Sequence, residues 1–228
     1  GNGGNAFSFS GTAPVIPQIP VALNASVAIG GSGGLGGNGG EIDVNHSGNI
    51  QTLGFRASGI AAQSIGGGGG DGGNATAVTL NVNVDASATV AIGGSGGSGG
   101  HGNLVDVNSS GTIMTAGDHA NAILAQSIGG GGGAGGDSTT VSIDFDFPTS
   151  PEDLVPMPGF SFDVSIGGSG GAGGNGGSVL VTSSDAILTE GMFATGVMAQ
   201  SIGGGGGVGG DARTLQFDSS ANPTDYVP

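Results

Sequence analysis

The string QSIGGGGG decides how this chain folds. It begins at Gln63, Gln126 and Gln200, and a second string, IGGSGG, begins at Ile29, Ile92 and Ile166. Both strings recur after 63 and then 74 residues (29 to 92 and 92 to 166; 63 to 126 and 126 to 200). The stretch from one string to the other therefore keeps its length, and only the segment between repeats varies. Fixed-period similarity of this kind indicates a repeat architecture in which each unit buries its surfaces against the next.

Glycine triplets flank every repeat. The tract after Ile29 reads GGS GGL GGN GGE, and the tract after Ile65 reads GGG GGD GGN. A three-residue period matches a polyglycine II-type helix, which has the polyproline II form and rises about 3.1 Å per residue. A flexible linker is the alternative, but a linker has no reason to keep the triplet phase in three copies. Because glycine loses much entropy on ordering, we expect the tracts to pack against one another or against strands.

Short strands are expected between the tracts, where the apolar pattern changes to a period of two residues. In the first repeat they cover 41–45 and 49–52, with a turn at Gly48 that suits a left-handed residue and a closing glycine at Gly54. The element over 57–65 contains alanines but is short and uncapped, which favours a strand over a helix. The segment 141–166 between repeats is expected to form a hairpin around a proline-rich tip at 148–159.

The predicted fold is all-β, a repetitive β-solenoid or β-helix-like stack with packed GGX segments of the polyglycine II type. Residues 1–28 are the end of a preceding module plus a hairpin, and the repeats are 29–91, 92–165 and 166–228. No signal peptide is visible at Gly1, and the chain starts inside a glycine tract, which is typical of a fragment of a longer protein.

The composition excludes several functional classes. The 228 residues include 56 glycines, 17 acidic residues, two basic residues and no cysteine, and the net charge is −15. This charge repels phosphate backbones and anionic headgroups, so neither nucleic acid nor a membrane surface is an expected partner. The lack of cysteine excludes disulfides, thiolate catalysis and cysteine-bound zinc. Since no apolar run reaches 18 residues, no membrane-spanning helix is predicted.

The run from Gly48 to Ile65, followed by five glycines, resembles repeats in very large autotransporter passenger domains of Gram-negative bacteria. Its residues read GNIQTxGxxAxGIxAQSI, and the resemblance covers nearly the whole chain. It implies type V secretion, a β-helical passenger on the outer face of the outer membrane, and adhesive, filament or biofilm-matrix roles. The chain contains neither the translocator barrel nor the signal sequence of that family.

No catalytic constellation emerges from the sequence. A phosphate loop needs a following helix and usually a lysine, and this chain has no lysine. The segment 36–44 only weakly matches a calcium nonapeptide. His46, His101 and His119 occupy non-equivalent repeat positions, which favours solvated histidines over a repeated metal or acid–base site. We therefore expect no enzyme activity and no cofactor, with calcium as the one ion to consider.

Two sets of side chains are candidates for a specific role. Asp144, Asp146 and Asp163 are placed on the outer face of one hairpin, where they are either solvated or bind calcium through oxygen ligands. The polar residues that recur in all three repeats are interpreted as ladders of like side chains bonded between modules, with a binding stripe as the alternative. They are Thr52, Thr115 and Thr189, Gln63, Gln126 and Gln200, and Ser64, Ser127 and Ser201.

The expected function is that of an extracellular structural repeat in a secreted surface adhesin or filament. Its expected partners are neighbouring copies or modules, with cell-surface or matrix components in addition, and head-to-tail association through open strand edges is predicted. A carbohydrate-active β-helix enzyme is one alternative. An ice- or mineral-binding repeat, suggested by the glycine tracts and the aligned threonines, is another.

Overall fold

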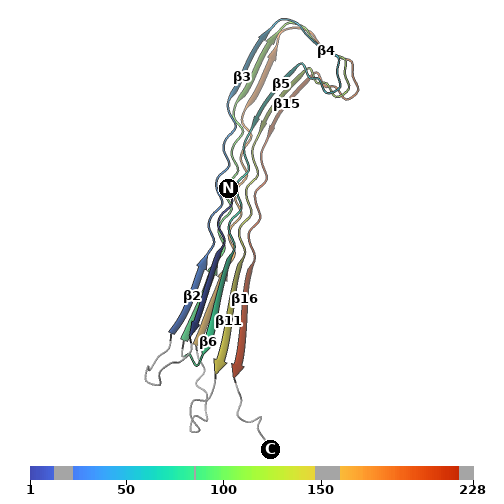
Figure 1. The fold of residues 1–228 in the computed structure, drawn as a ribbon. Coiled ribbons are helices and arrows are strands. Elements are labelled where there is room, and N and C mark those ends of the chain that lie inside the picture. Colours follow the sequence, from blue (N-terminus) through green and yellow to red (C-terminus); the bar gives the residue numbers. More distant parts are fainter. Residues whose placement is uncertain (13–22, 85, 147–159, 221–228) are drawn as a thin grey trace, which may run out of the picture.

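The computed structural model describes residues 1–12, 23–84, 86–146 and 160–220, and within them every regular element is a strand. The chain makes repeated long excursions, here called rungs, each with a forward arm, a tip and a return arm (Figure 1). The strands are β1 (Ala6–Thr12); β2 (Leu23–Ile29), β3 (Ile42–Ser47), β4 (Ile50–Thr52), β5 (Ile60–Ile65) and β6 (Ala75–Val82) in the first rung; β7 (Ala86–Ile92), β8 (Val105–Ser110), β9 (Ile113–Thr115), β10 (Ile123–Ile128) and β11 (Ser138–Asp146) in the second; and β12 (Phe160–Ile166), β13 (Val179–Ser183), β14 (Ile187–Thr189), β15 (Val197–Ile202) and β16 (Ala212–Ser220) in the third.

Equivalent strands of successive rungs pair in parallel. They form one sheet of four strands, β1-β6-β11-β16, and four sheets of three strands, centred on β7, β8, β9 and β10. The register joins equivalent residues, so that Gln126 pairs with both Gln63 and Gln200. The all-β fold and the in-register stacking predicted from the repeat are therefore confirmed, and the 57–65 element is a strand over Ile60–Ile65.

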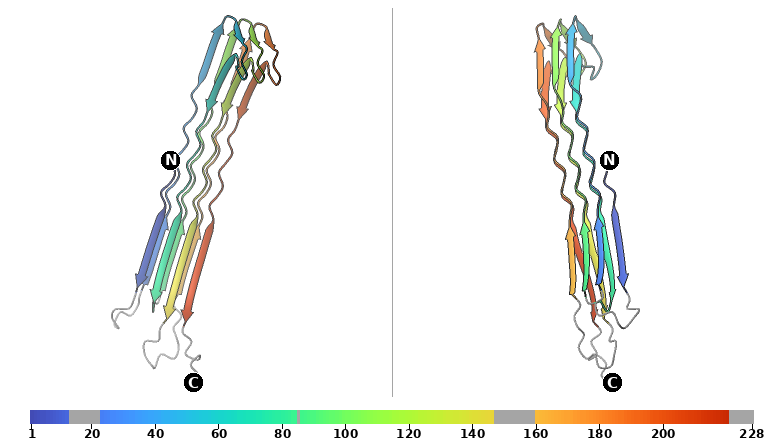
Figure 2. Two further views of the ribbon diagram at one scale, coloured as in Figure 1. Left: turned by 45° about the vertical axis from the view of Figure 1, so that its right-hand side comes forward. Right: turned by 90° about the vertical axis from the view of Figure 1, so that its left-hand side faces the viewer.

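Glycine tracts connect the lower strands to the upper strands of each arm, and the rungs lie side by side along the whole length (Figure 2). The first glycine of a triplet donates to the same arm of the next rung, as Gly33 N does to Ser95 O at 2.8 Å. The second glycine bonds across the arms: Gly70 N donates to Gly34 O, and Gly97 N donates to Gly70 O, both at 2.8 Å. The tracts thus form a hydrogen-bonded lattice in two directions.

The two ends of the stack differ in what lies between the arms. In the upper end, Val105, Val107, Ile113 and Ile123 are fully buried and form an apolar core with their neighbours. In the lower end, the facing sheets enclose small and polar side chains, such as Ser26, Thr79 and Thr140. Hydroxyls of facing strands bond directly, which places these sheets closer than the ~10 Å of ordinary sheet packing.

One prediction about the strands is wrong. The segment over 141–166 is not a hydrogen-bonded hairpin in the described residues, because β11 pairs with β6 and β16 while β12 pairs with β7. The backbone groups of β11 and β12 instead bond to equivalent strands of neighbouring rungs, and the two strands belong to two different sheets. The turn glycines Gly48 and Gly111 have positive φ angles, as predicted, and Arg56, His119 and Phe193 of the tips have positive φ angles as well. The predicted tip at 148–159 lies outside the described residues.

Candidate functional surfaces

The glycine lattice has no room for side chains on its inner edges. A Cβ built on Gly96 would lie 2.1 Å from Gly133 O, and one on Gly97 would lie 2.1 Å from Gly34 O. The third residue of each triplet points outward, and Leu35 is 78% exposed. The triplet sequence therefore separates two packed positions from one free position, and only the free position can carry chemistry.

Acceptor side chains at the free positions connect the rungs. Asn38 Oδ1 accepts the backbone N–H of His101, and His101 Nδ1 accepts that of Asn175, both at 2.8 Å. On the return arm, Asn74 and Asp137 accept the N–H groups of Asp137 and Asp211 in the same way. In these pairs the acceptor belongs to one rung and the N–H to the next, so the stack has a direction.

The glutamines form the ladder expected from their spacing. Gln63 Nε2 donates to Gln126 Oε1 at 2.6 Å, and Gln126 Nε2 donates to Gln200 Oε1 at 2.6 Å. The ladder runs along the outward side of β5, β10 and β15. Each amide N–H donates to the following rung, which is also the direction in which the first glycine of each triplet donates.

The threonines and serines bond to the backbone instead of to like side chains, which corrects the ladder interpretation for them. Thr115 Oγ1 donates to Ala120 O at 2.8 Å within its own tip, and Thr52 makes the equivalent bond. Ser127 Oγ donates to Asn103 O and accepts from Gly177 N of the next rung, both at 2.7 Å. Thr189 and Ser201 take the same register positions in the third rung. Because Thr115 is fully buried, the aligned threonines do not form an exposed ice-binding row.

Asp144 and Asp163 lie inside the lower sheet pair, which corrects their expected place on an outer face. Asn81 Nδ2 donates to Asp144 Oδ1. The oxygens of Asp163 are buried and make no hydrogen bond of normal geometry within the described residues. Burial raises the pKa of the Asp163 carboxyl, the nearby hydroxyls of Thr89 and Ser161 lower it in part, and the Asp144 carboxylate raises it further.

The described residues contain no cluster of three or more His, Asp or Glu side chains that could hold a metal ion. Asp146 ends β11. Calcium takes six to eight oxygen ligands, so Asp144 and Asp163 alone are too few, and a calcium site stays a prediction. His46 contacts Gly48 O at 3.1 Å, while His101 and His119 lie elsewhere in the rung. Within the described part of the chain, no helix has the length and apolarity to cross a membrane.

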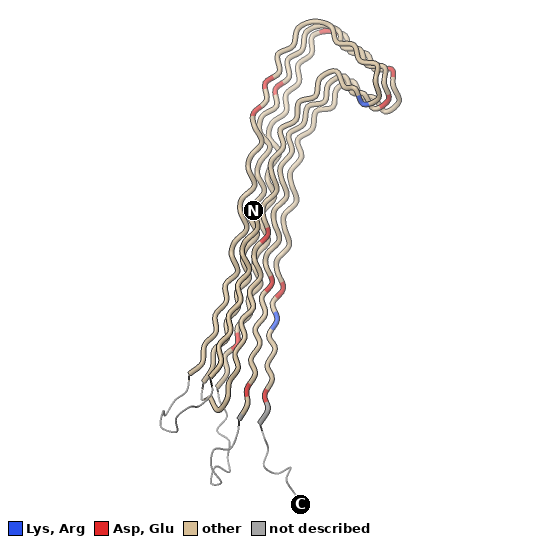
Figure 3. The backbone as a smooth tube through the Cα atoms, viewed as in Figure 1, with Lys and Arg blue, Asp and Glu red and all other residues tan. Residues whose placement is uncertain are grey.

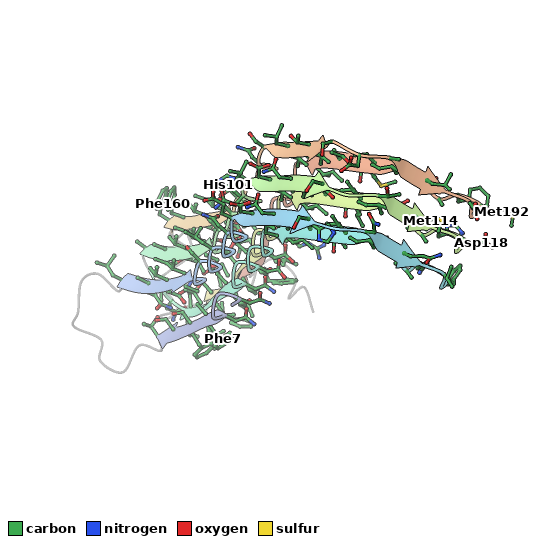
Figure 4. The ribbon with its side chains drawn as sticks, turned by 90° about the horizontal axis from the view of Figure 1, so that it is seen from above. Phe7, His101, Met114, Asp118, Phe160 and Met192 are labelled. Carbon is green, nitrogen blue, oxygen red and sulfur yellow. The ribbon has the colours of Figure 1, made fainter. Side chains whose placement is uncertain are left out.

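The tips carry an exposed stack of rings and one cation. The His119 ring lies 5.6 Å from that of Phe55 and is stacked on that of Phe193 at 5.1 Å, and the Arg56 guanidinium lies 5.3 Å from the Phe55 ring centre. Arg56, His119 and Phe193 all have φ near 55°, a conformation that bulky residues adopt rarely. Figure 4 shows Asp118 and Met192 of the tips far from Phe7 and Phe160 at the lower end. The repeat pattern does not predict this stack, because the equivalent positions hold three different residue types, Arg56, His119 and Phe193.

Large apolar side chains cover the outside of the lower sheets. Phe7, Phe9, Leu23 and Phe160 are each at least 60% exposed. The burial pattern alternates along β2, β6 and β7, with small or polar residues inward and mostly apolar residues outward. The usual partition of polar and apolar residues is thus inverted at this end of the molecule.

Comparisons with protein-family models, with curated proteins and with solved structures give no match.

Proposed function

We propose that this chain is a structural module of an extracellular surface protein, an adhesin or filament in which rungs add edge to edge. In this proposal the stack is a β-solenoid, and its glycine tracts are polyglycine II-type helices that hold the arms together. The observation that carries the proposal is the directional lattice. Each rung offers N–H donors and side-chain acceptors on one edge, and carbonyls and N–H groups that complement them on the other.

The third rung carries the acceptor edge in this chain. Asn175 and Asp211 occupy the positions at which the inner rungs accept an N–H from the rung that follows. Gly170 occupies the position at which Gly33 and Gly96 donate to the next rung. A further rung, from the same polypeptide or from another copy, would satisfy all of these groups without rearrangement. Such an open stack suits a load-bearing or length-setting role.

The location is proposed from the resemblance of the repeat to autotransporter passenger repeats, from the lack of cysteine and from the acidic composition. Export through the outer membrane requires a chain without disulfides that folds after secretion, and repeats with nearest-neighbour contacts fold progressively in that way. Adhesion to cell-surface or matrix components would then use side chains at the free triplet positions and at the tips.

Sedimentation velocity and electron microscopy at low and high salt test the proposal. We expect elongated assemblies that grow at high salt, because screening reduces the repulsion between chains of charge −15. The double substitution Asn175→Ala and Asp211→Ala should shorten them, while Leu35→Ala, at an exposed free position, should not. A folded monomer in every ionic condition would contradict the proposal and favour a self-contained binding domain.

A further inference from the structure

The outside of the lower forward arm is an uncharged face, here called the forward face. It consists of the outward positions of β2, β7 and β12, continued by the free triplet positions from residue 32 to residue 38 and their equivalents. On the strands, every outward residue is Ala, Val, Leu, Ile or Phe, and Leu23, Ile29 and Phe160 are at least 60% exposed. On the tract the face continues with Ser32, Leu35 and Asn38 and with their equivalents in the other rungs, which are serines, Ala172, His101 and Asn175.

Within the described residues, the acidic side chains lie away from this face. Apart from Asp163, they occur on the upper forward arm, at the tips and on the return arm (Figure 3). The nearest acid above the face on the first forward arm is Glu41, three residues or about 9 Å beyond Asn38 at ~3.1 Å per residue. That separation exceeds the Debye length of about 8 Å in physiological salt. Asp163 lies on β12 but faces inward between the sheets. The acidic residues of the described part of the chain therefore do not keep a partner off the forward face.

The rows of this face favour a partner of the same kind. Ile29, Ile92 and Ile166 form one row and Val27, Val90 and Val164 form another, each with one residue per rung. A flat face with rows at the strand spacing interdigitates best with another face of that spacing. The hydrocarbon of a lipid layer fits less well, because the hydroxyls of the serines at 32, 95 and 169 would lose their water without gaining a hydrogen-bond partner.

The area also fits a second copy. Strands of seven residues at ~3.3 Å, with the tract to residue 38 at ~3.1 Å per residue, give a length of about 50 Å. Three rungs at ~4.8 Å give a width of about 14 Å, and hence about 700 Å² per copy. A standard stable interface buries ~800 Å² per partner. We propose that the forward face packs against the forward face of a second copy of this chain, sheet on sheet. This lateral contact goes beyond the proposed function, because rung addition uses edges and not this face.

The test uses matched valines on opposite sheets. Val90 lies at the centre of the forward face, and Val78 lies at an outward position on β6, on the outside of the facing sheet. Both variants carry Asp211→Ala, which lies on the return arm, weakens edge stacking without changing the forward face, and so separates the two kinds of contact. We expect a monomer–dimer equilibrium in sedimentation, an association constant at least ~10-fold lower for Val90→Lys, and no change for Val78→Lys.

Cross-linking identifies the face directly, since the chain contains no cysteine. A short bismaleimide should link Val90→Cys chains into dimers and leave Val78→Cys chains as monomers. Circular dichroism checks that each variant is folded. A monomer at all concentrations, or equal loss of dimer with both lysines, would overturn the proposal. Binding of the unsubstituted chain to phosphatidylcholine vesicles that Val90→Lys abolishes would also overturn it, because lipid would then cover the face.

Discussion

Replacing Gly100 by alanine should destabilise the stack by about 0.5–4 kcal/mol. The new Cβ would lie 2.0 Å from Gly37 O, so the two rungs must separate by about 1.4 Å to reach ordinary contact. Three hydrogen bonds of 2.8 Å hold this site, from Gly36 N to Ser98 O, from Gly39 N to His101 O and from Gly100 N to Gly67 O. Each lost bond costs about 0.5–1.5 kcal/mol net. The lower entropy of alanine in the unfolded chain offsets only about 0.4–1 kcal/mol.

Gly37→Ala is the matched control, because Gly37 is the equivalent residue of the first rung and a Cβ there meets nothing within 4 Å. We expect it to be neutral or stabilising by up to ~1 kcal/mol. Urea unfolding followed by far-ultraviolet circular dichroism measures both free energies of unfolding. If the two alanines shift the midpoint equally, steric exclusion between rungs does not explain the triplet pattern.

Three further changes test the lattice, the serine bridge and the buried acid. Gly96→Val should lower the melting temperature far more than Ser98→Ala, and equal losses on thermal melting would argue against packed triplets. Ser127→Ala should cost about 1–3 kcal/mol in urea unfolding, since it removes two bonds at a fully buried site; a neutral result would refute the bridge. The folded pKa of Asp163 is raised above 3.8, so its contribution to stability is largest at low pH and falls as pH rises through that raised pKa. Asp163→Asn should therefore stabilise the fold at pH 7 and flatten this fall, and an unchanged pH profile would contradict it.

Much of the architecture could be predicted because the repeat is regular. The equal spacing of Gln63, Gln126 and Gln200 predicts that they stack, and each pair of neighbouring rungs indeed joins them by an amide hydrogen bond. Constant length from Ile29 to Ile65 also predicts that the glycine tracts pack. Periodicity shows which residues repeat and which alternate. In the structure, the repeating residues pair in the parallel sheets and the alternating residues lie on opposite faces of a strand.

The direction in which alternating residues point could not be predicted from their period. Alternation alone leaves both faces open, and the usual solvation of charged residues favours an outer position for Asp144 and Asp163, whereas they lie between the sheets. The signal that would have corrected this is residue size. Asn24, Ser26 and Ala28 share one parity of β2, and the opposite parity holds Leu23, Val27 and Ile29.

Close packing of the glycine tracts explains why the size of a side chain decides whether it points inward or outward. The arms touch backbone to backbone along the tracts, so strands that leave the tracts begin too close together for large side chains. Ala28, Ala75 and Ala91 are almost fully buried where the lower sheets begin, and facing hydroxyls bridge the sheets farther along, as Thr79 and Thr89 do at 2.8 Å. Phenylalanines and isoleucines are excluded from this narrow space and occupy the outer positions. Towards the tips the arms separate, so that Ile113 and Ile123 fit between them. The same glycine lattice therefore produces an ordinary core at one end and exposed apolar faces at the other, and any partner that covers apolar surface should bind at the lower end.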